Sequence, residues 1–129
     1  MAGKDGPLDL LTAHELAREI EAGGLSAREA AEAANARVEE VEPEVNAFVT
    51  PTPELALERA GRVDRRAGGR KLWETVPLVV KDVLSTRGIR TTCGSKILEY
   101  FEPLYDASAL LNFGEEPIVV GKSNMDEFA

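Results

Sequence analysis

Apolar residues recur at helical spacing through the first third of the chain. Thr12 and Glu15 precede the first run in a Thr-x-x-Glu sequence, and Ser26 and Glu29 precede the second in a Ser-x-x-Glu sequence. Each is a capping box, in which hydroxyl and carboxylate oxygens accept backbone N–H groups at the start of a helix. The apolar positions of the second run are Ala30, Ala33, Ala34, Val38 and Val41. The pattern predicts a helical hairpin over 8–42.

Strand and helix signals alternate after this hairpin. Pro43 is expected to end the second helix, because the residue before a proline is driven away from helical geometry. Residues 45–50 (VNAFVT) favour a short strand. Thr52 can then cap a third helix, with Pro53 in its first turn and Ala67 at its end, before two glycines.

Two apolar runs of strand length follow. Residues 76–83 (VPLVVKDV) predict a buried strand whose end carries Lys81 and Asp82. Residues 117–120 predict another strand, and 121–124 are expected to turn out of it. Between the two strands we predict a loop at 85–95, a helical turn at 96–101 and a short helix from Asp106, its cap, to Phe113.

Strands separated by helices indicate the α/β class. Two or three strands cannot form a covered sheet alone, so either further strands come from elsewhere or the chain is a fragment. On this ground we expect poor stability of the isolated chain.

Composition narrows the function classes. The chain has 129 residues, 43% of them hydrophobic and 29% charged, which is typical of a globular domain. Its formal net charge of −8 argues against broad binding to nucleic acid or to a membrane surface. The single cysteine excludes an internal disulfide, and no apolar run has the length of a membrane span. We expect a soluble, cytoplasmic protein.

Lys81 is the leading candidate for chemistry. A lysine inside an apolar run is expensive to bury in its charged form, and that desolvation lowers its pKa. A neutral lysine can act as a base toward a nearby serine hydroxyl. The alternative is an ordinary lysine at a strand end, exposed or paired with Asp82.

Other candidate motifs are weaker. The small polar residues at 91–95 either line a pocket or form a turn with local hydrogen bonds. Cys93 has no histidine near it, since the only histidine, His14, lies on the first helix. The Gly-Lys-Ser at 121–123 is not a phosphate-binding loop, because that motif requires glycine where this chain has Glu116.

Two charged clusters are assigned to solvent rather than to ligands. The basic residues at 62–71 suit the C-terminal end of a helix, and we favour this interpretation over an anion site. Asp126 and Glu127 have no partners at the spacing of metal ligands. We therefore predict no metal and no cofactor bound by this chain.

The segments VPLVVKDVLSTRGIRTTCGSKILEYFEPLYDAS (76–108) and VVGKSNMDEFA (119–129), taken together, resemble the amidase-signature family. Within it they are most similar to the A subunits of glutamyl-tRNA(Gln)/aspartyl-tRNA(Asn) amidotransferases. The resemblance covers about 8–129. It implies that 1–129 is the N-terminal part of a single amidase domain, with the helical hairpin at 8–42 and the start of an α/β/α mixed sheet at 45–129, incomplete in this chain.

The resemblance also implies a Ser–cis-Ser–Lys mechanism. Lys81 matches the family's catalytic lysine, the general base that takes a proton through a bridging cis-serine from the nucleophilic serine. The nucleophile attacks the side-chain amide of glutamine, and the ammonia released passes to a partner subunit that amidates Glu-tRNA or Asp-tRNA. The implied partners are the B and C subunits of the complex, of which B binds tRNA and C clamps the glutamine-hydrolysing subunit. ATP and magnesium are used by the assembled complex.

Two departures from the family shape the remaining expectations. Both family serines lie downstream of the NMDEFA motif at 124–129, so we expect this chain alone to be inactive. The entrance to the last strand is about one residue shorter than is usual, with Glu116 and Pro117 at the turn. Two alternatives stay open: a fragment of a general amidase acting on small amides, and a non-catalytic module that binds a partner.

Overall fold

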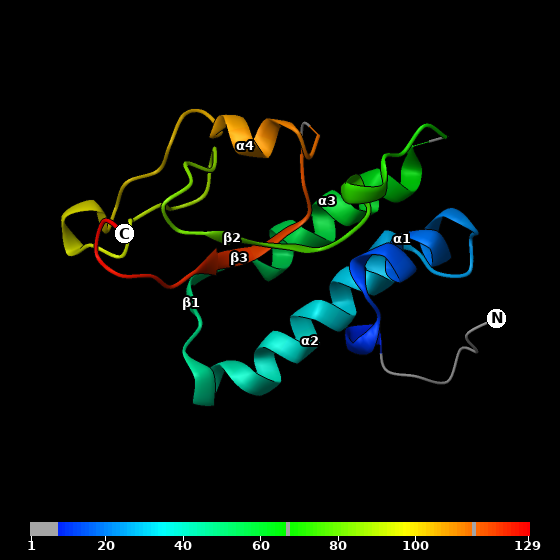
Figure 1. The fold of residues 1–129 in the computed structure, drawn as a ribbon, viewed down its shortest axis with the longest axis horizontal. Helices are drawn as coiled ribbons and strands as arrows, with labels where there is room; N and C mark the ends of the chain where they lie inside the picture. The colour runs from blue at the N-terminus through cyan, green and yellow to red at the C-terminus, as the bar shows by residue number, and fades with distance from the viewer. Residues whose placement is uncertain (1–7, 67, 115) are drawn as a thin grey trace.

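The computed structural model describes residues 8–66, 68–114 and 116–129. These residues form a mixed α/β fold around a three-stranded sheet in the order β1-β3-β2 (Figure 1). The strands are β1 (Phe48–Pro51), β2 (Leu78–Lys81) and β3 (Val119–Ser123). The central strand β3 pairs antiparallel with β1 and parallel with β2. The α/β class predicted from the sequence is confirmed.

Three helices cover one side of the sheet, and a short helix lies on the other side with the long loop (Figure 1). The long helices are α1 (Ala13–Glu21), α2 (Ala27–Val45) and α3 (Pro53–Arg65), and the short one is α4 (Ser108–Leu111). Single 3-10 turns occur at Leu8–Leu10, Leu72–Glu74 and Lys96–Leu98. The last of these lies inside the helical turn predicted at 96–101.

Both predicted capping boxes are present. Thr12 Oγ1 accepts the Glu15 backbone N–H at 3.3 Å, and the Glu15 carboxylate accepts the Thr12 N–H at 2.9 Å. The Ser26 and Glu29 pair repeats this arrangement at 3.0 and 2.8 Å. Asp64 of α3 adds a further acceptor, because its carboxylate accepts N–H groups from the first turn of α2.

The helix side of the sheet has an apolar core built from small residues. Ala31 of α2 and Ala60 of α3 are fully buried, which lets the two helices approach closely. Ile118 and Val120 contribute the sheet's part of this core. Val119 belongs instead to a smaller cluster on the other side, with Val80, Ile89 and Leu110.

The predicted end of the second helix is wrong. Helix α2 continues through Pro43 to Val45, so it is longer than the sequence pattern indicated. Asn46 ends it in the left-handed conformation (φ 51°), and its N–H donates to the Glu42 carbonyl at 2.9 Å. The Glu42 carboxylate also accepts the N–H of Phe48 at 2.8 Å, which satisfies the backbone as it leaves the helix.

Two other predicted caps also differ. Thr52 begins α3 but makes no side-chain cap, because its hydroxyl donates to the Val119 carbonyl at 2.8 Å. Asp106 does not cap α4; its carboxylate accepts the Arg87 N–H at 2.7 Å instead. Both side chains connect segments distant in sequence. The predicted helix end at Ala67 lies outside the described residues.

Candidate functional site

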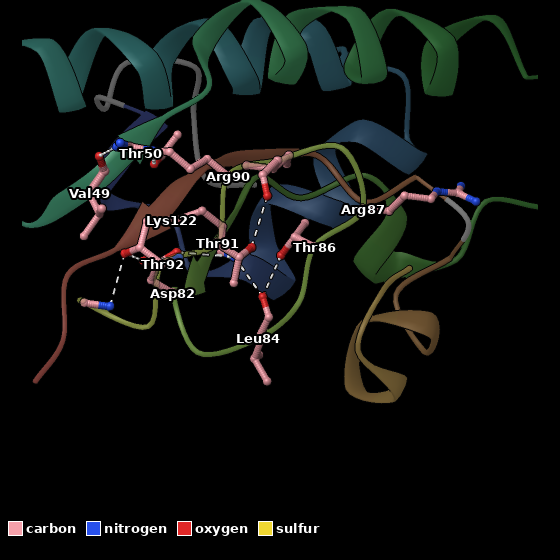
Figure 2. Close-up of polar contacts among 12 residues, drawn as sticks. Val49, Thr50, Asp82, Leu84, Thr86, Arg87, Arg90, Thr91, Thr92 and Lys122 are labelled. Atoms are coloured by element: carbon pink, nitrogen blue, oxygen red, sulfur yellow. Dashed lines mark hydrogen bonds and ion pairs between the residues drawn. The ribbon is translucent and has the colours of Figure 1, made fainter. Parts of the chain in front are cut away.

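The candidate site lies where β2 and β3 end and the loop that follows β2 begins (Figure 2). Lys81 is the last residue of β2, and its side chain is exposed. Of the two alternatives that the sequence left open, the structure therefore shows the exposed lysine at a strand end and not the lysine buried in the apolar run. The side chain makes no hydrogen bond or ion pair with any residue that the structure describes. Strand alternation explains its exposure, because Val80 occupies the buried face.

Asp82 follows Lys81 directly and is fully buried. Its carboxylate Oδ2 accepts both the backbone N–H (3.0 Å) and the hydroxyl of Thr92. Its own backbone N–H donates to the Ser123 carbonyl at 3.2 Å, and its carbonyl accepts the Cys93 N–H at 3.2 Å. The backbone immediately after Lys81 is therefore fixed on two sides.

The buried lysine of this region is Lys122, in β3 (Figure 2). Its Nζ donates to the Leu84 carbonyl at 2.8 Å and to Thr91 Oγ1 at 2.7 Å. The same nitrogen lies 3.6 Å from Asp82 Oδ1, and both side chains are fully buried. No described residue donates a hydrogen bond to that carboxylate oxygen, so Lys122 supplies its compensating charge.

The sequence pattern did not indicate Lys122 as a site residue, because it predicted a turn at 121–124, and that prediction is wrong. Residues 121–123 are the end of β3. Leu78 pairs with Val119 but Val79 pairs with Gly121, so the pairing shifts by one residue. Beyond the shift Lys122 pairs with Val80, on the face opposite to Ile118 and Val120.

Gly121 is the one residue in the sequence that indicates that β3 continues beyond Val120. A Cβ on Gly121 would lie 2.4 Å from a ring carbon of Phe48 and 3.0 Å from the Thr50 carbonyl oxygen. Glycine there allows β1 to approach β3, which is a role glycine has inside strands as well as in turns. The two roles look the same in a sequence, because the approaching strand is distant along the chain.

The two lysines differ in what they can do chemically. Burial lowers the pKa of Lys122 below its ordinary value, and the Asp82 carboxylate opposes part of this lowering. The Lys122 ammonium nevertheless donates to two oxygens inside the protein and has no exposed surface, so no substrate can reach it. Lys81 presents the accessible amine of the pair.

The polar loop at 91–95 directs its threonine hydroxyls into the protein, mainly to residues distant in sequence, and forms no open polar surface there. Thr91 and Thr92 are buried, and their hydroxyls bond to Lys122, to Asp82 and to the Ile89 carbonyl. Cys93 is half-buried and adopts a positive φ of 53°. A hollow of about 260 Å³ lies beside this loop, and Arg90 is one of the residues that line it. The Arg90 guanidinium donates to the Thr50 hydroxyl and to the Val49 carbonyl of β1 (Figure 2).

The remaining candidates do not gather at this site. His14 is exposed on α1. In the basic cluster at 62–71, Arg62 pairs with Glu58 and Glu116, each at 2.6 Å, and Arg66 pairs with Glu74 at 3.4 Å.

Metal-ligand clusters and membrane-spanning helices are both absent from 8–66, 68–114 and 116–129. Those residues contain no group of three or more His, Cys, Asp or Glu side chains that could hold a metal ion. Glu127 instead accepts the Ser95 hydroxyl at 2.6 Å. None of the helices in the same ranges is both long enough and apolar enough to cross a membrane.

Comparison with protein families and curated proteins gives consistent matches. The family described as "Amidase" matches residues 29–129. The A subunit of glutamyl-tRNA(Gln) amidotransferase from Rubrobacter xylanophilus is 67% identical over 122 residues, and the protein of the same name from Geobacter metallireducens is 48% identical over 122 residues. Each alignment includes 92% of this chain and 25% of the relative, so the chain spans about a quarter of the length of these proteins.

A solved structure of an amidase is also similar to this chain. Native peptide amidase from Stenotrophomonas maltophilia superimposes with a TM-score of 0.84 at 26% sequence identity. The superposition covers 95% of this chain and 26% of the peptide amidase. Again the similarity extends over nearly the whole of this chain and about a quarter of the other.

Proposed function

The chain belongs to the amidase family, and from this premise we propose that residues 1–129 are the N-terminal part of a single amidase domain, in the A subunit of a tRNA-dependent amidotransferase. The hairpin at 8–42 and the start of the α/β core at 45–129 are the proposed parts of that domain. The parent protein hydrolyses glutamine and supplies ammonia for converting Glu-tRNA(Gln) to Gln-tRNA(Gln), or Asp-tRNA(Asn) to Asn-tRNA(Asn). The 67% identity to the Rubrobacter xylanophilus protein supports this choice.

Lys81 is the proposed catalytic lysine of this reaction. The observation that carries the assignment is an exposed amine at the carboxyl end of β2, directly before a buried and fixed Asp82. The carboxyl ends of parallel strands are where open α/β sheets bind their ligands. In the proposed role Lys81 is the general base that accepts, through a cis-serine, the proton of the nucleophilic serine.

Neither catalytic serine is assigned to this chain. Ser95 is excluded on geometry, because it is buried and its hydroxyl donates to Glu127. Both serines are proposed to lie downstream, in the part of the parent that the relatives contain and this chain does not span. Residues 1–129 alone are therefore expected to hydrolyse no amide.

The proposed partners follow from the same function. Of the B and C subunits, B would bind the tRNA and C would clamp the glutamine-hydrolysing subunit, while ATP and magnesium serve the assembled complex rather than this chain. Because its proposed substrates are tRNAs used in translation, the complex is proposed to act in the cytoplasm. The net charge of −8 agrees with tRNA being bound mainly through another subunit.

A general amidase is the second candidate, and the superposition on peptide amidase favours it. The two candidates differ in the substrate, which is free glutamine for the first and other small amides or peptide amides for the second. Both kinds of substrate can be tested on the same active protein, so their hydrolysis rates can be compared directly.

The test is a chimeric protein, in which residues 1–129 replace the matching quarter of the Rubrobacter xylanophilus relative, co-expressed with that organism's partner subunits. We expect glutaminase activity, and loss of at least about 1,000-fold in kcat for Lys81→Ala because the general base is removed. Lys71→Ala is the matched control, since Lys71 is also an exposed lysine but lies beside Trp73. Full activity in Lys81→Ala would contradict the assignment, and faster hydrolysis of peptide amides than of glutamine would favour the second candidate.

A further inference from the structure

Lys122 is a charged side chain of this region to which the proposed reaction gives no role. It is fully buried in β3, whereas Lys81 is exposed at the end of β2. A buried ammonium is expensive unless hydrogen bonds and a counter-charge compensate it. The presence of a buried ammonium beside the candidate base therefore requires an explanation.

The hydrogen bonds of Lys122 lead directly to the turn that follows Lys81. The Leu84 N–H donates to the Lys81 carbonyl at 3.0 Å, which closes the turn. The Leu84 carbonyl, on the other side of the same residue, accepts from Lys122 Nζ at 2.8 Å. Lys122 thus holds Leu84, and Leu84 holds the backbone of Lys81.

A second connection runs through the polar loop. Lys122 donates to Thr91, and the neighbouring Thr92 donates twice to Asp82 (Figure 2). Asp82 follows Lys81 in the chain and lies 3.6 Å from the Lys122 ammonium. One buried cation therefore joins β3, the turn after Lys81 and the loop at 91–92.

We propose that Lys122 is a positioning residue for Lys81, because it fixes the backbone from which the exposed amine projects toward the reacting groups. The inference rests on the proposed function, in which Lys81 is the base. Lys122 itself never contacts substrate. Its effect is geometric, since proton transfer requires the base to be held within a fraction of an ångström of its partner.

The test uses the chimeric protein and the double variant Lys122→Met/Asp82→Asn. Removing both charges avoids leaving Asp82 buried without its partner, so that the fold is retained. We expect kcat for glutamine to fall roughly 10- to 100-fold, with KM within about twofold of its original value. Ile118→Val is the control for a general loss of stability, because Ile118 is fully buried on the other face of the sheet.

Hydrogen exchange supplies a readout that does not depend on activity. The Leu84 and Thr92 amides should lose protection in the double variant, since their acceptors are no longer held, and should keep it in Ile118→Val. Unchanged protection at both amides, an unchanged kcat in a folded double variant, or a kcat loss equal to that of Ile118→Val would each overturn the proposal. An inactive unsubstituted chimera would contradict the proposed function alone, and exchange would then decide the role of Lys122.

Discussion

Ile118 and Val120 face three helices across an apolar core, whereas Val119, between them, faces only a small cluster and a network of buried polar groups. On the helix side most buried residues are alanine, valine, leucine or isoleucine. On the other side Asp82, Thr91, Thr92 and Lys122 are all buried and hydrogen-bonded to one another or to backbone. The helix side is stabilised mainly by the burial of apolar surface, and the other side is stabilised by buried polar groups that hydrogen-bond to one another.

The two sides also differ in how strictly their contacts fix the position of a residue. Apolar contacts have no preferred direction, whereas a buried ion pair compensates its desolvation only in a well-defined geometry. The polar side is therefore suited to fixing the position of one residue, and Lys81 is attached to it.

Breaking the ion pair should produce the largest loss of stability. Asp82→Ala leaves the Lys122 ammonium buried without a counter-charge and removes the acceptor of both Thr92 hydrogen bonds. We expect destabilisation of about 3–5 kcal/mol, measured as a lower urea midpoint of the chimeric protein. Activity should fall in the folded fraction as well, because the turn after Lys81 is released. A stability loss smaller than that of a surface substitution would show that the pair is not structurally required.

Overpacking the apolar core on the helix side should give a smaller loss of stability, and it should leave kcat unchanged. Ala60→Leu inserts three methyl-sized groups where α2 and α3 meet, at a side chain that is fully buried. We expect about 1–3 kcal/mol of destabilisation by the same urea measurement. At a temperature where the variant is folded, kcat should equal that of the unsubstituted protein. A selective fall in kcat would mean that the helices also position the site, and the contrast between the two sides would not hold.

The elements that the sequence predicted well are those specified by neighbouring residues. Both capping boxes need only side chains three positions apart, and the mixed α/β class needs only the order of the runs. The missed end of α2 is an exception to this rule, because Asn46 and the Glu42 carboxylate, which end the helix, are also close to Pro43 in the sequence.

The candidate site was only partly predictable. The end of the apolar run indicated Lys81 and Asp82, but not that their side chains differ completely in burial. Lys122 was missed because a turn was predicted at 121–124, where β3 continues. The face on which Lys122 lies also depends on a one-residue shift in the pairing of β2 with β3, two strands about 40 positions apart. The acceptors of Lys122, at Leu84 and Thr91, are likewise distant in sequence.

The smallest change in stability should come from the surface ion pair between Arg62 of α3 and Glu116, which lies at the entrance to β3. The Arg62 guanidinium donates to both oxygens of Glu116 at 2.6 and 2.7 Å, and this hydrogen bonding lowers the pKa of Glu116 below its ordinary value. A carboxylate with a lowered pKa contributes stability that is fully present above its unfolded pKa and is lost as the pH falls through its folded value. Glu116→Gln should therefore lower the urea midpoint slightly at pH 7, and less than either substitution above, because the Glu116 side chain is 39% exposed and solvent screens the pair.

Comparing the two proteins as the pH is lowered separates this pair from the buried one. The difference in midpoint between Glu116→Gln and the unsubstituted chimera should vanish in acid, and it should also shrink in about 1 M salt, where the screening length falls to about 3 Å. The corresponding difference for Asp82→Ala should persist in the same salt, because no solvent reaches the buried pair. If salt reduced the midpoint differences of Glu116→Gln and Asp82→Ala equally, both ion pairs would be exposed to solvent. The network around Lys122 would then stabilise the backbone of Lys81 no more than an ordinary surface contact does.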